Sequence, residues 1–555
     1  MNLRSKLKYI EKLAKDALFT LQYVGESKVL HRRSLPGAAT FSKDIWKLKI
    51  GPQLAIAFNA RTRGDQCALI FGDKSWTYKE LDQEINQLSR ALASMGVSGK
   101  DAVGIMLPNC SEHLIAQETM PRIGVVAAQI GYRLKSAEIA HILDNADPQI
   151  LIYHYLYEAE VRGANAGDTF LETSQIMVVG APEGVETYGL RYEEIVGSQQ
   201  REMPILRDAG AGGVIVYTSG TTGKPKGASR SWKDTGLVSV TDLMAKTGIR
   251  SDDVHLVVCP LYHSAALAFA KMVLGLGATV VLADHFDAEE VLRCIESEKI
   301  TCAFFVPTML VRLNALDPEI RQKYDTSSLR WVMSGAAPLA TATANEFQNN
   351  FGQILHNFYG ATETGVVSHA GPDDHLRHPG SVGRPLRGNQ LRIIDELGEE
   401  VRTGEVGELY VNNAMLIDGY HKNMEATLNS QLDGYFSVGD LASVDSEGYL
   451  FLASRKHDMV LSGGVNIYPR EIENVLHQHP DVLEAAVTGI PDPEWGECVG
   501  AFVVLRKGVN LSESDLQGYC KDHLASYKQP RHVVFLNSLP RNETGKVLKQ
   551  KLLLL

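Results

Sequence analysis

The sequence predicts an α/β protein with a large N-terminal body of αβαβα-type parallel sheets, a small β-subdomain and a small α+β C-terminal domain. From residue 68 onward, short apolar runs alternate with helical patterns, which is typical of parallel strands covered on both faces. After about residue 380, short strands and glycine-rich turns take over. The length of 555 residues indicates several domains, and 44% apolar with 22% charged residues excludes a disordered or fibrous chain.

The elements of the body follow in order along the chain. A capping box at Thr77–Glu80 predicts the start of a helix, and Gly96 predicts its end. Residues 265–283 have the hydropathy of a membrane span, but Lys271 and two glycines favour a buried helix followed by a core strand. No period of 20–50 residues recurs, which excludes solenoids and propellers. Short strands are expected at residues 103–107, 124–128, 149–153, 214–217, 255–258, 303–306 and 331–333.

Three parts are expected along the chain. They are an N-terminal amphipathic helical extension (1–48), the large body (49–455) with its β-subdomain at about 380–455, and a C-terminal domain (456–555). Strands at 393–395, 407–411 and 448–451 indicate the β-subdomain, and helix–strand alternation returns from Pro469. We expect the boundary of the C-terminal domain near Arg455–Asp458, in a charged loop between two β-rich stretches.

The charge is unevenly distributed. The formal net charge is −11, which argues against a nucleic-acid-binding protein. Residues 1–50, however, hold eleven basic and four acidic residues, a net charge of +7. Within them, residues 3–21 form an apolar helical stripe with lysines beside it, and the favoured interpretation is a helix docked on the protein's own surface. Peripheral contact with an anionic membrane is the alternative interpretation. We expect a cytoplasmic protein, which under this alternative would lie on the inner face of the membrane.

The seven cysteines are widely spread and form neither a Cys-x-x-Cys pair nor a cluster with zinc spacing. We therefore expect them to be buried small apolar residues in a reducing compartment. The N-terminus lacks the continuous apolar segment of a signal peptide. The sequence leaves the oligomeric state open.

The strongest chemical motif is Tyr217–Gly227, which directly follows an apolar strand. Its three glycines allow tight backbone turns that aim amide groups at an anion, while four hydroxyl side chains and two lysines add donors and charge. No register matches the Walker A pattern, so a P-loop kinase or ATPase is disfavoured. A flexible linker would explain neither the preceding strand nor the paired lysines. The motif predicts a phosphate-binding loop.

Three weaker segments carry chemistry of the same kind. Tyr359–Gly365 offers a ring for a nucleobase and Glu363 as a hard oxygen donor for Mg²⁺. The pair Gly439-Asp440 offers a carboxylate for ribose hydroxyls. Pro540–Lys546 is a polar loop that ends in a lysine. Taken singly, the first two are ordinary turns and the third is an ordinary solvated loop.

In order and spacing, these four segments resemble the adenylate-forming superfamily, which includes acyl-CoA synthetases, luciferases and peptide-synthetase adenylation domains. The resemblance covers roughly residues 50 to 550. Further segments fit it: Ser334–Pro338 is similar to the adenine-contacting strand end, Leu261–Ser264 to the aromatic gate of the acyl pocket, and Ser462–Pro469 to the loop that turns towards the thiol. It identifies Arg455 with the hinge, where His457 departs from the usual Asp or Lys and puts the pH dependence of a domain rotation in doubt.

The resemblance implies a role for each matching residue. Lys546, Glu363 and His263 would be catalytic, with Lys546 bridging the substrate carboxylate and the α-phosphate. Thr218 and Glu363 would hold Mg²⁺, Tyr359 and Ala337 would contact adenine, and Asp440 and Arg455 would contact ribose. The implied cofactor-binding residues are Thr218, Ser219, Gly220, Thr221, Thr222, Gly223, Lys226, Gly335, Ala336, Ala337, Asn357, Tyr359, Gly360, Thr362, Asp440, Arg455, Gly463 and Gly464.

The implied reaction has two halves and uses ATP, CoA and Mg²⁺. A carboxylic acid is converted to an acyl-adenylate with release of pyrophosphate, and the acyl group is then transferred to CoA with release of AMP. The gate segment Tyr262–Leu267 has no carboxylate for an amino-acid substrate but has two alanines and a leucine, so a hydrophobic acid, first a fatty acid, is expected. Bile acids and sterol side-chain acids stay open. The alternatives are an acyl-AMP ligase, a luciferase-like enzyme, or a non-catalytic lipid-uptake or scaffold protein.

Overall fold

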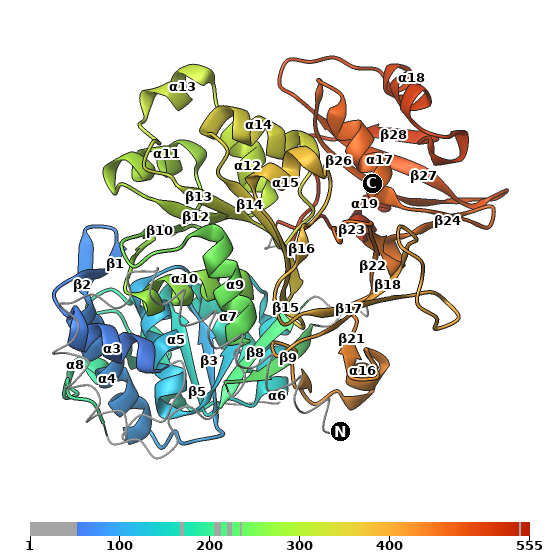
Figure 1. Cartoon of the computed structure of the whole chain (residues 1–555). Helices are drawn as coiled ribbons and strands as arrows, with labels where there is room; N and C mark the ends of the chain where they lie inside the picture. Colours follow the sequence, from blue (N-terminus) through green and yellow to red (C-terminus); the bar gives the residue numbers. More distant parts are fainter. Residues whose placement is uncertain (1–52, 167–170, 205–211, 219–224, 233–235, 543–544) are drawn as a thin grey trace, which may run out of the picture. The chain divides into compact units, whose positions relative to one another are not determined.

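The computed structural model describes residues 53–166, 171–204, 212–218, 225–232, 236–542 and 545–555, which form two compact units (Figure 1). Unit 1 contains the described residues up to Asp287, together with Cys294–Phe304 and Ala414–Asn429. Unit 2 contains Ala288–Arg293, Phe305–Asn413 and Ser430–Leu555. The N-terminal extension at 1–48 and its predicted helix lie outside the described residues.

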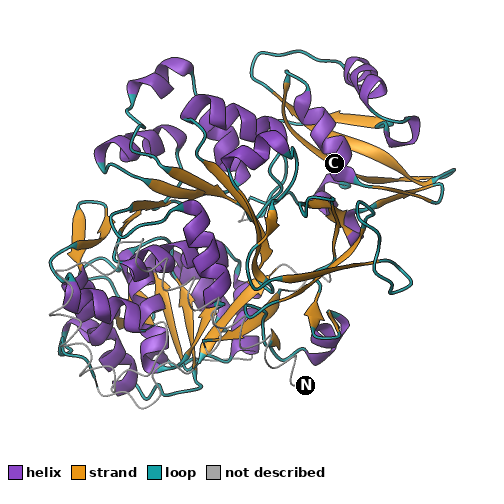
Figure 2. Cartoon of the chain, viewed as in Figure 1, coloured by secondary structure: helices purple, strands orange, loops and turns teal. Residues whose placement is uncertain are grey.

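The main sheet of unit 1 has the strand order β19-β9-β8-β4-β3-β5-β6-β7. The six strands from β8 to β7 pair in parallel, while β9 and β19 pair antiparallel. Helices surround these strands, as the alternating pattern predicts (Figure 2). The strands are β3 (Ala102–Met106), β4 (Val126–Gln129), β5 (Ile150–His154), β6 (Ile176–Val179), β7 (Leu190–Arg191), β8 (Gly213–Thr218), β9 (Lys226–Ser231) and β19 (Gly419–Tyr420).

A second set of strands in unit 1 pairs in the order β12-β10-β11-β1-β2, with only the β1–β2 pair antiparallel. The strands are β1 (Cys67–Phe71), β2 (Lys74–Thr77), β10 (Val254–Val257), β11 (Thr279–Leu282) and β12 (Cys302–Phe305). The expected short strands of the body are thus confirmed, apart from shifts of one or two residues at their ends. The largest shift is at Gly124, which ends a helix in a left-handed conformation (φ 74°) before β4 begins.

The helices of unit 1 begin and end where the sequence signals predict. Helix α4 (Tyr78–Ser94) starts at the Thr77–Glu80 capping box, in which each side chain bonds the other residue's backbone N–H. The apolar stretch at 265–283 is helix α10 (Ser264–Leu276) followed by β11, and no described helix is long and apolar enough to span a membrane. The remaining α-helices are α3 (Leu54–Thr62), α5 (Ser111–Ile123), α6 (Ser136–Ala146), α7 (Glu158–Ala164), α8 (Tyr192–Gly197), α9 (Leu237–Thr247) and α16 (Met424–Asn429).

Unit 2 begins with four paired strands and ends with the C-terminal segment, defined as residues 459–555. Strand β14 (Leu355–Ala361) lies parallel to β13 (Trp331–Ser334) and antiparallel to β15 (Gly365–Ala370), which pairs with β16 (Arg384–Pro385). The associated helices are α12 (Pro307–Asn314), α13 (Pro318–Lys323), α14 (Thr341–Phe351) and α15 (Pro372–Arg377).

The β-rich stretch predicted after residue 380 is a six-stranded sheet in the order β20-β21-β18-β22-β23, with β17 paired to β18. Its apolar residues, including Leu409, Val411 and Leu450, pack with Tyr359 and Val367 into one buried cluster. The strands are β17 (Gln390–Ile394), β18 (Gly407–Asn412), β20 (Gln431–Leu432), β21 (Tyr435–Phe436), β22 (Asp440–Val444) and β23 (Leu450–Arg455). Arg455 therefore ends a strand, and only Lys456–Asp458 form the turn that follows it.

The C-terminal segment has its own five-stranded sheet and buried core. The strand order is β25-β24-β27-β26, and β28 lies parallel to β27. Helix α17 (Pro469–Gln478) contributes Ile472 and Leu476 to a core shared with Val487 and Val503. The other elements are β24 (Val460–Ser462), β25 (Val465–Ile467), β26 (Val482–Asp492), β27 (Gly496–Leu505), α18 (Glu513–His523), β28 (His532–Phe535) and α19 (Lys549–Leu552).

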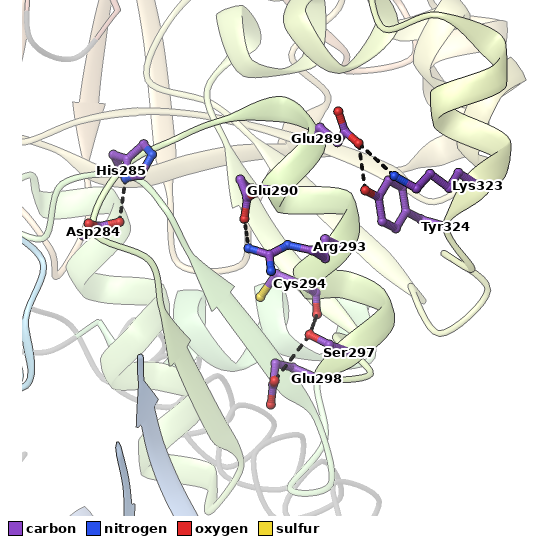
Figure 3. A network of polar contacts seen from close by, with 10 residues as sticks. All are labelled: Asp284, His285, Glu289, Glu290, Arg293, Cys294, Ser297, Glu298, Lys323 and Tyr324. Atoms are coloured by element: carbon purple, nitrogen blue, oxygen red, sulfur yellow. Dashed lines mark hydrogen bonds and ion pairs between the residues drawn. The ribbon is translucent and has the colours of Figure 1, made fainter. Parts of the chain in front are cut away.

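The cysteine prediction needs one correction. All seven cysteines are free, and five are buried, but Cys67 and Cys294 are only half-buried. Cys294 lies on helix α11 (Ala288–Ser297), whose charged residues alternate with apolar ones and form a polar network with solvent access (Figure 3). In this network Glu289 accepts hydrogen bonds from the Tyr324 hydroxyl at 2.8 Å and from Lys323 at 3.4 Å. Such exposed pairs contribute little stability.

Candidate active site

A buried carboxylate of unit 2 is held by two partners. The Tyr359 hydroxyl, on β14, donates to Asp440 Oδ2 at 2.6 Å, and Arg455 Nε lies 3.4 Å from Asp440 Oδ1. Asp440 and Arg455 face each other in the β22–β23 register. Burial, and secondly the charge of Asp440, raise the pKa of Tyr359 well above its ordinary value, so the phenol stays a donor. The arrangement is a fixed, ionised acceptor for hydroxyl groups.

Two polar side chains near this carboxylate strand are buried without a partner. Ser334 ends β13 and Asn357 lies opposite it in the parallel β13–β14 register. Among the described residues, neither Ser334 Oγ nor Asn357 Oδ1 has a hydrogen-bond partner. A buried polar atom without a partner is costly, so a polar ligand here would relieve that cost. This observation fits a nucleotide base or sugar at the ends of β13 and β14.

The segment after β13 has an unusual backbone. Gly335 is required because a Cβ there would lie 2.5 Å from the Phe358 ring. Ala336 adopts a left-handed conformation with φ 66°, which is uncommon for a residue other than glycine. Ala336 is exposed and Ala337 is half-buried, so the predicted adenine-contacting segment Gly335–Ala337 is accessible only beyond Gly335.

The turn between β14 and β15 carries the predicted metal ligand. Glu363 is 7% exposed, and Thr362 beside it is half-buried. Gly360 allows the two strands to approach, because a Cβ there would lie 2.1 Å from the Gly365 carbonyl oxygen. A carboxylate and a hydroxyl are hard oxygen donors, so this part of the donor set fits Mg²⁺. The other predicted ligand, Thr218, belongs to unit 1.

Lys546 lies in unit 2, the same unit as the Asp440 carboxylate. It is half-buried, and burial, followed by the charge of Arg455, lowers the pKa of its amine to about 8, while Asp458 and Asp440 act in the opposite direction. Its backbone N–H donates to Asn542 Oδ1 at 2.9 Å. At neutral pH the amine is therefore still charged, in surroundings where a charge is less screened than in bulk water.

The predicted thiol-facing turn is a glycine pair between β24 and β25. Gly463 and Gly464 have φ angles of +56° and +81°, which glycine adopts most readily. The Gly463 N–H donates to the Trp495 carbonyl at 2.9 Å, and a Cβ on Gly463 would lie 2.6 Å from the Trp495 ring. The turn therefore exposes its backbone beside a half-exposed indole.

In unit 1 the phosphate motif lies between two antiparallel strands. Thr218 ends β8 and pairs in register with Lys226, the first residue of β9. The Lys226 amine lies 5.4 Å from the centre of the Tyr420 ring. The strand predicted before the motif is confirmed as β8, and β9 after the motif is an element that the sequence did not predict. Five of its predicted ligands, Ser219, Gly220, Thr221, Thr222 and Gly223, lie outside the described residues.

His263 caps the start of α10 in unit 1. Its ring centre lies 4.0 Å from that of Tyr262 in a tilted arrangement, and Tyr262 packs edge-on against Tyr132 at 5.4 Å. Burial, and secondly the nearby Arg133, lower the pKa of His263 to about 3, so the imidazole is neutral. Its Nε2 is buried and has no hydrogen-bond partner among the described residues. A neutral ring can offer this nitrogen to a ligand as a donor or an acceptor.

Comparison with known proteins gives a consistent result. The AMP-binding enzyme family model matches residues 56–421, and the model of the AMP-binding enzyme C-terminal domain matches residues 471–546.

The chain belongs to the AMP-binding enzyme family.

Two relatives and one solved structure show the range of similarity. A 2-succinylbenzoate–CoA ligase from Bacillus licheniformis is 32% identical over 491 residues, which cover 88% of this chain and 96% of that protein. An indoleacetate–CoA ligase from Aromatoleum aromaticum is 33% identical over 493 residues, with 87% and 93% covered. A solved anthranilate CoA ligase bound to anthranoyl-AMP superposes with a TM-score of 0.83 at 27% identity, covering 91% of this chain and 97% of that one.

This AMP-binding enzyme is an acid–thiol ligase of the adenylate-forming type, and the predicted enzyme class and α/β fold are confirmed. ATP-dependent CoA ligases of the family use ATP, CoA and Mg²⁺. The contact between Tyr359 and Asp440, and that between Asp440 and Arg455, join residues that the sequence analysis treated separately.

Two features of this AMP-binding enzyme were not predicted from the sequence: the effect of Arg133 on the pKa of His263, and the Arg541–Glu484 ion pair. The sequence analysis assigned no role to Arg133, because a lone arginine after a tyrosine carries no signal by itself. Arg541 lies within the quoted loop Pro540–Lys546, but its partner Glu484 is 57 residues away, so no local pattern could have paired them.

Proposed function

We propose that this enzyme converts a hydrophobic carboxylic acid, and first of all an aromatic one, into its CoA thioester through an acyl-adenylate. The observation that carries the proposal is that Lys546 lies within electrostatic reach of the Asp440–Arg455 ion pair of the same unit, so that the charges of both residues act on its pKa. This arrangement is suited to binding a nucleotide. The Asp440 carboxylate would hold the sugar, and the Lys546 amine would neutralise the α-phosphate.

In the first half-reaction, a carboxylate oxygen of the acid attacks the α-phosphorus of ATP, and the bond to the pyrophosphate oxygen breaks. Lys546 stabilises the developing negative charge, and Asp440 and Arg455 orient the ribose. Tyr359 keeps the Asp440 carboxylate in place through its 2.6 Å hydrogen bond. Glu363 would contribute an oxygen ligand to Mg²⁺, which supplies further charge neutralisation to the phosphate oxygens when bound. The residues of the protein thus position and neutralise but form no covalent bond.

In the second half-reaction, the CoA sulfur attacks the acyl carbon, and the bond to AMP breaks. We propose that the C-terminal segment rotates about residues 455–458 between the two halves, so that the Gly463–Gly464 turn replaces Lys546. Burial lowers the pKa of His457 from its ordinary value, which favours the neutral imidazole at this hinge residue.

The aromatic preference has two supports. The relatives described above are named for succinylbenzoate, indoleacetate and anthranilate, which all contain an aromatic ring. In addition, the gate segment of this chain is itself aromatic: the rings of Tyr262 and His263 are in contact, and Tyr132 packs against Tyr262. Aromatic rings pack favourably against one another. A fatty acid is the second candidate, which the small residues Ala265 and Ala266 after the gate favour.

A screen of acids tests the proposal. Pyrophosphate release is measured with benzoate-, cinnamate- and indole-type acids, with fatty acids of graded length and with sterol acids, each with and without CoA. We expect release with at least one aromatic acid, a thioester by mass spectrometry, and a kcat/KM at least tenfold above that of any fatty acid. Pyrophosphate release without a thioester would instead indicate an acyl-AMP ligase or a luciferase-like enzyme. Ligand binding without any release would indicate a non-catalytic protein.

A further inference from the structure

The peptide bond that precedes Lys546 is fixed on both of its sides. Its carbonyl oxygen, on Gly545, accepts a hydrogen bond from Arg541 Nη1 at 2.6 Å. Its N–H, on Lys546, donates to Asn542 Oδ1 at 2.9 Å. Gly545 has a φ of +78°, so the backbone turns sharply just before the lysine. Because both polar groups of this peptide are bound, the direction in which the Lys546 side chain leaves the backbone is set.

The arginine that holds this peptide is anchored elsewhere in the C-terminal segment. Arg541 Nη2 lies 2.6 Å from Glu484 Oε1, and both side chains are largely buried, at 23% and 17% exposure. Glu484 lies on β26, where it pairs in register with Val504 of β27. Arg541 itself pairs with Val547 across the loop. The anchor is therefore part of the β26–β27 strand pair at one edge of the sheet.

The guanidinium is engaged at both of its terminal nitrogens, one with Glu484 and one with the Gly545 carbonyl. Arginine suits this task because its planar fork holds two acceptors in a fixed geometry, which a lysine amine cannot do. The next cation after Lys546, Lys549, is likewise bound, 2.8 Å from Glu473. Both flanking cations are thus used within the segment.

We propose that the Arg541–Glu484 ion pair is a positioning device that holds Lys546 for the adenylation half-reaction. The ion pair ties the Gly545–Lys546 peptide bond, which sets the direction of the Lys546 side chain, to the β26–β27 strand pair. The proposal rests on the proposed function in that Lys546 is taken to act in adenylation. Arg541 acts through Lys546 and is a positioning residue.

Two variants test the device. Arg541→Lys keeps the charge but loses the fork, and Glu484→Gln keeps the shape but loses the anchor's charge. We expect kcat for acid-dependent ATP–pyrophosphate exchange to fall by about 10- to 100-fold in each, because a displaced catalytic group costs this much. The KM for ATP should change less than about twofold, and thioester formation from supplied acyl-AMP less than about threefold, since neither uses the aim of Lys546.

A second readout needs no substrate. Trace labelling of Lys546 with acetic anhydride, measured by mass spectrometry against pH, should have its midpoint near the pKa of about 8 in the unmodified enzyme. The four charged neighbours of Lys546, namely Arg455, Asp458, Asp440 and Lys549, stay in place in both variants. A midpoint raised by about one pH unit in Arg541→Lys would therefore report a lysine released into solvent.

Lys528→Gln is the matched control. Lys528 also forms an ion pair within the C-terminal segment, with both oxygens of Glu471 at 2.7 Å, but among the described residues it has no hydrogen bond or ion pair with the loop that carries Lys546. It should leave both half-reactions and the labelling midpoint unchanged. Unchanged exchange and labelling in Arg541→Lys and Glu484→Gln, or an equal loss of both half-reactions together with a lower Tm, would overturn the proposal. If no acid supports exchange, the proposed function fails, and the labelling result alone decides on the ion pair.

Discussion

Two loops of the C-terminal segment, each assigned to one half-reaction, are built by opposite means. The lysine loop (residues 541–547) is held by side chains, through Arg541, Asn542 and the distant Glu484. The glycine turn (residues 462–465) is held by its backbone, through the β24–β25 pairing and the bond from Gly463 to the Trp495 carbonyl. Under the proposed mechanism, this difference matches a first half-reaction that needs a placed charge and a second that needs an unobstructed backbone beside which a thiol can pass.

The largest expected effect comes from removing the placed charge. Lys546→Ala should lower acid-dependent pyrophosphate exchange by about 1,000-fold, because one preorganised charge at the reacting phosphate contributes on this scale. Thioester formation from supplied acyl-AMP should stay within about threefold, since the glycine turn is intact. The two rates are measured separately, and an equal loss in both would remove the distinction between the loops.

The next effect comes from obstructing the glycine turn. Gly463→Ala places a Cβ 2.6 Å from the Trp495 ring at a φ of +56°, so the turn must shift. We expect thioester formation to fall by about 10- to 100-fold while exchange is largely kept. Gly508→Ala is the matched control, because Gly508 also has a positive φ (+80°) in the same segment but nothing within 4 Å of an added Cβ. A loss in Gly508→Ala as large as in Gly463→Ala would attribute the effect to backbone conformation in general.

A smaller effect is expected in the pH profile. It distinguishes the roles of the two loops without a substitution in either of them. The amine of Lys546 has its pKa lowered to about 8, mainly by burial, and acts in its charged form. Exchange should therefore be constant below that value and fall about tenfold per pH unit above it, as the proton is lost. Thioester formation from acyl-AMP should lack this alkaline decline, because Lys546 takes no part in it.

Asp458→Asn provides the control for the pH profile. Asp458 raises the pKa of Lys546, so its removal should move the alkaline decline to lower pH. A decline that does not move, or moves upward, would show that another group titrates in this range.

Much of the fold could be predicted from the sequence, because its signals are local. The capping box at Thr77–Glu80 and the terminating Gly96 lie within one helix, and the apolar strand runs mark their own positions. The site could be predicted only as separate motifs. That Tyr359 binds Asp440, 81 residues away, depends on how the β14 and β22 strands meet, and no spacing encodes it.

The same limit explains what the sequence analysis missed in the lysine loop. The motif Pro540–Lys546 identified the lysine but not its support, because Glu484 lies on a strand that reads as ordinary sheet. The charged loop was predicted to begin at Arg455. In the structure Arg455 still pairs with Asp440 across two strands, and the turn begins one residue later, at Lys456. Sequence periodicity predicts where a strand lies, but not at which residue its last hydrogen bond to the neighbouring strand forms.

The anchoring of the lysine loop on β26 also sets a rule for recombining this protein with its relatives. A crossover placed anywhere between residues 484 and 541 would take the loop from one parent and its anchor from the other. A transfer of the whole segment 459–555 keeps the two together, whereas a graft of only the last twenty residues separates them. The sheet and the loop must therefore be transferred together, although Lys546 lies only nine residues before the last residue of the printed sequence.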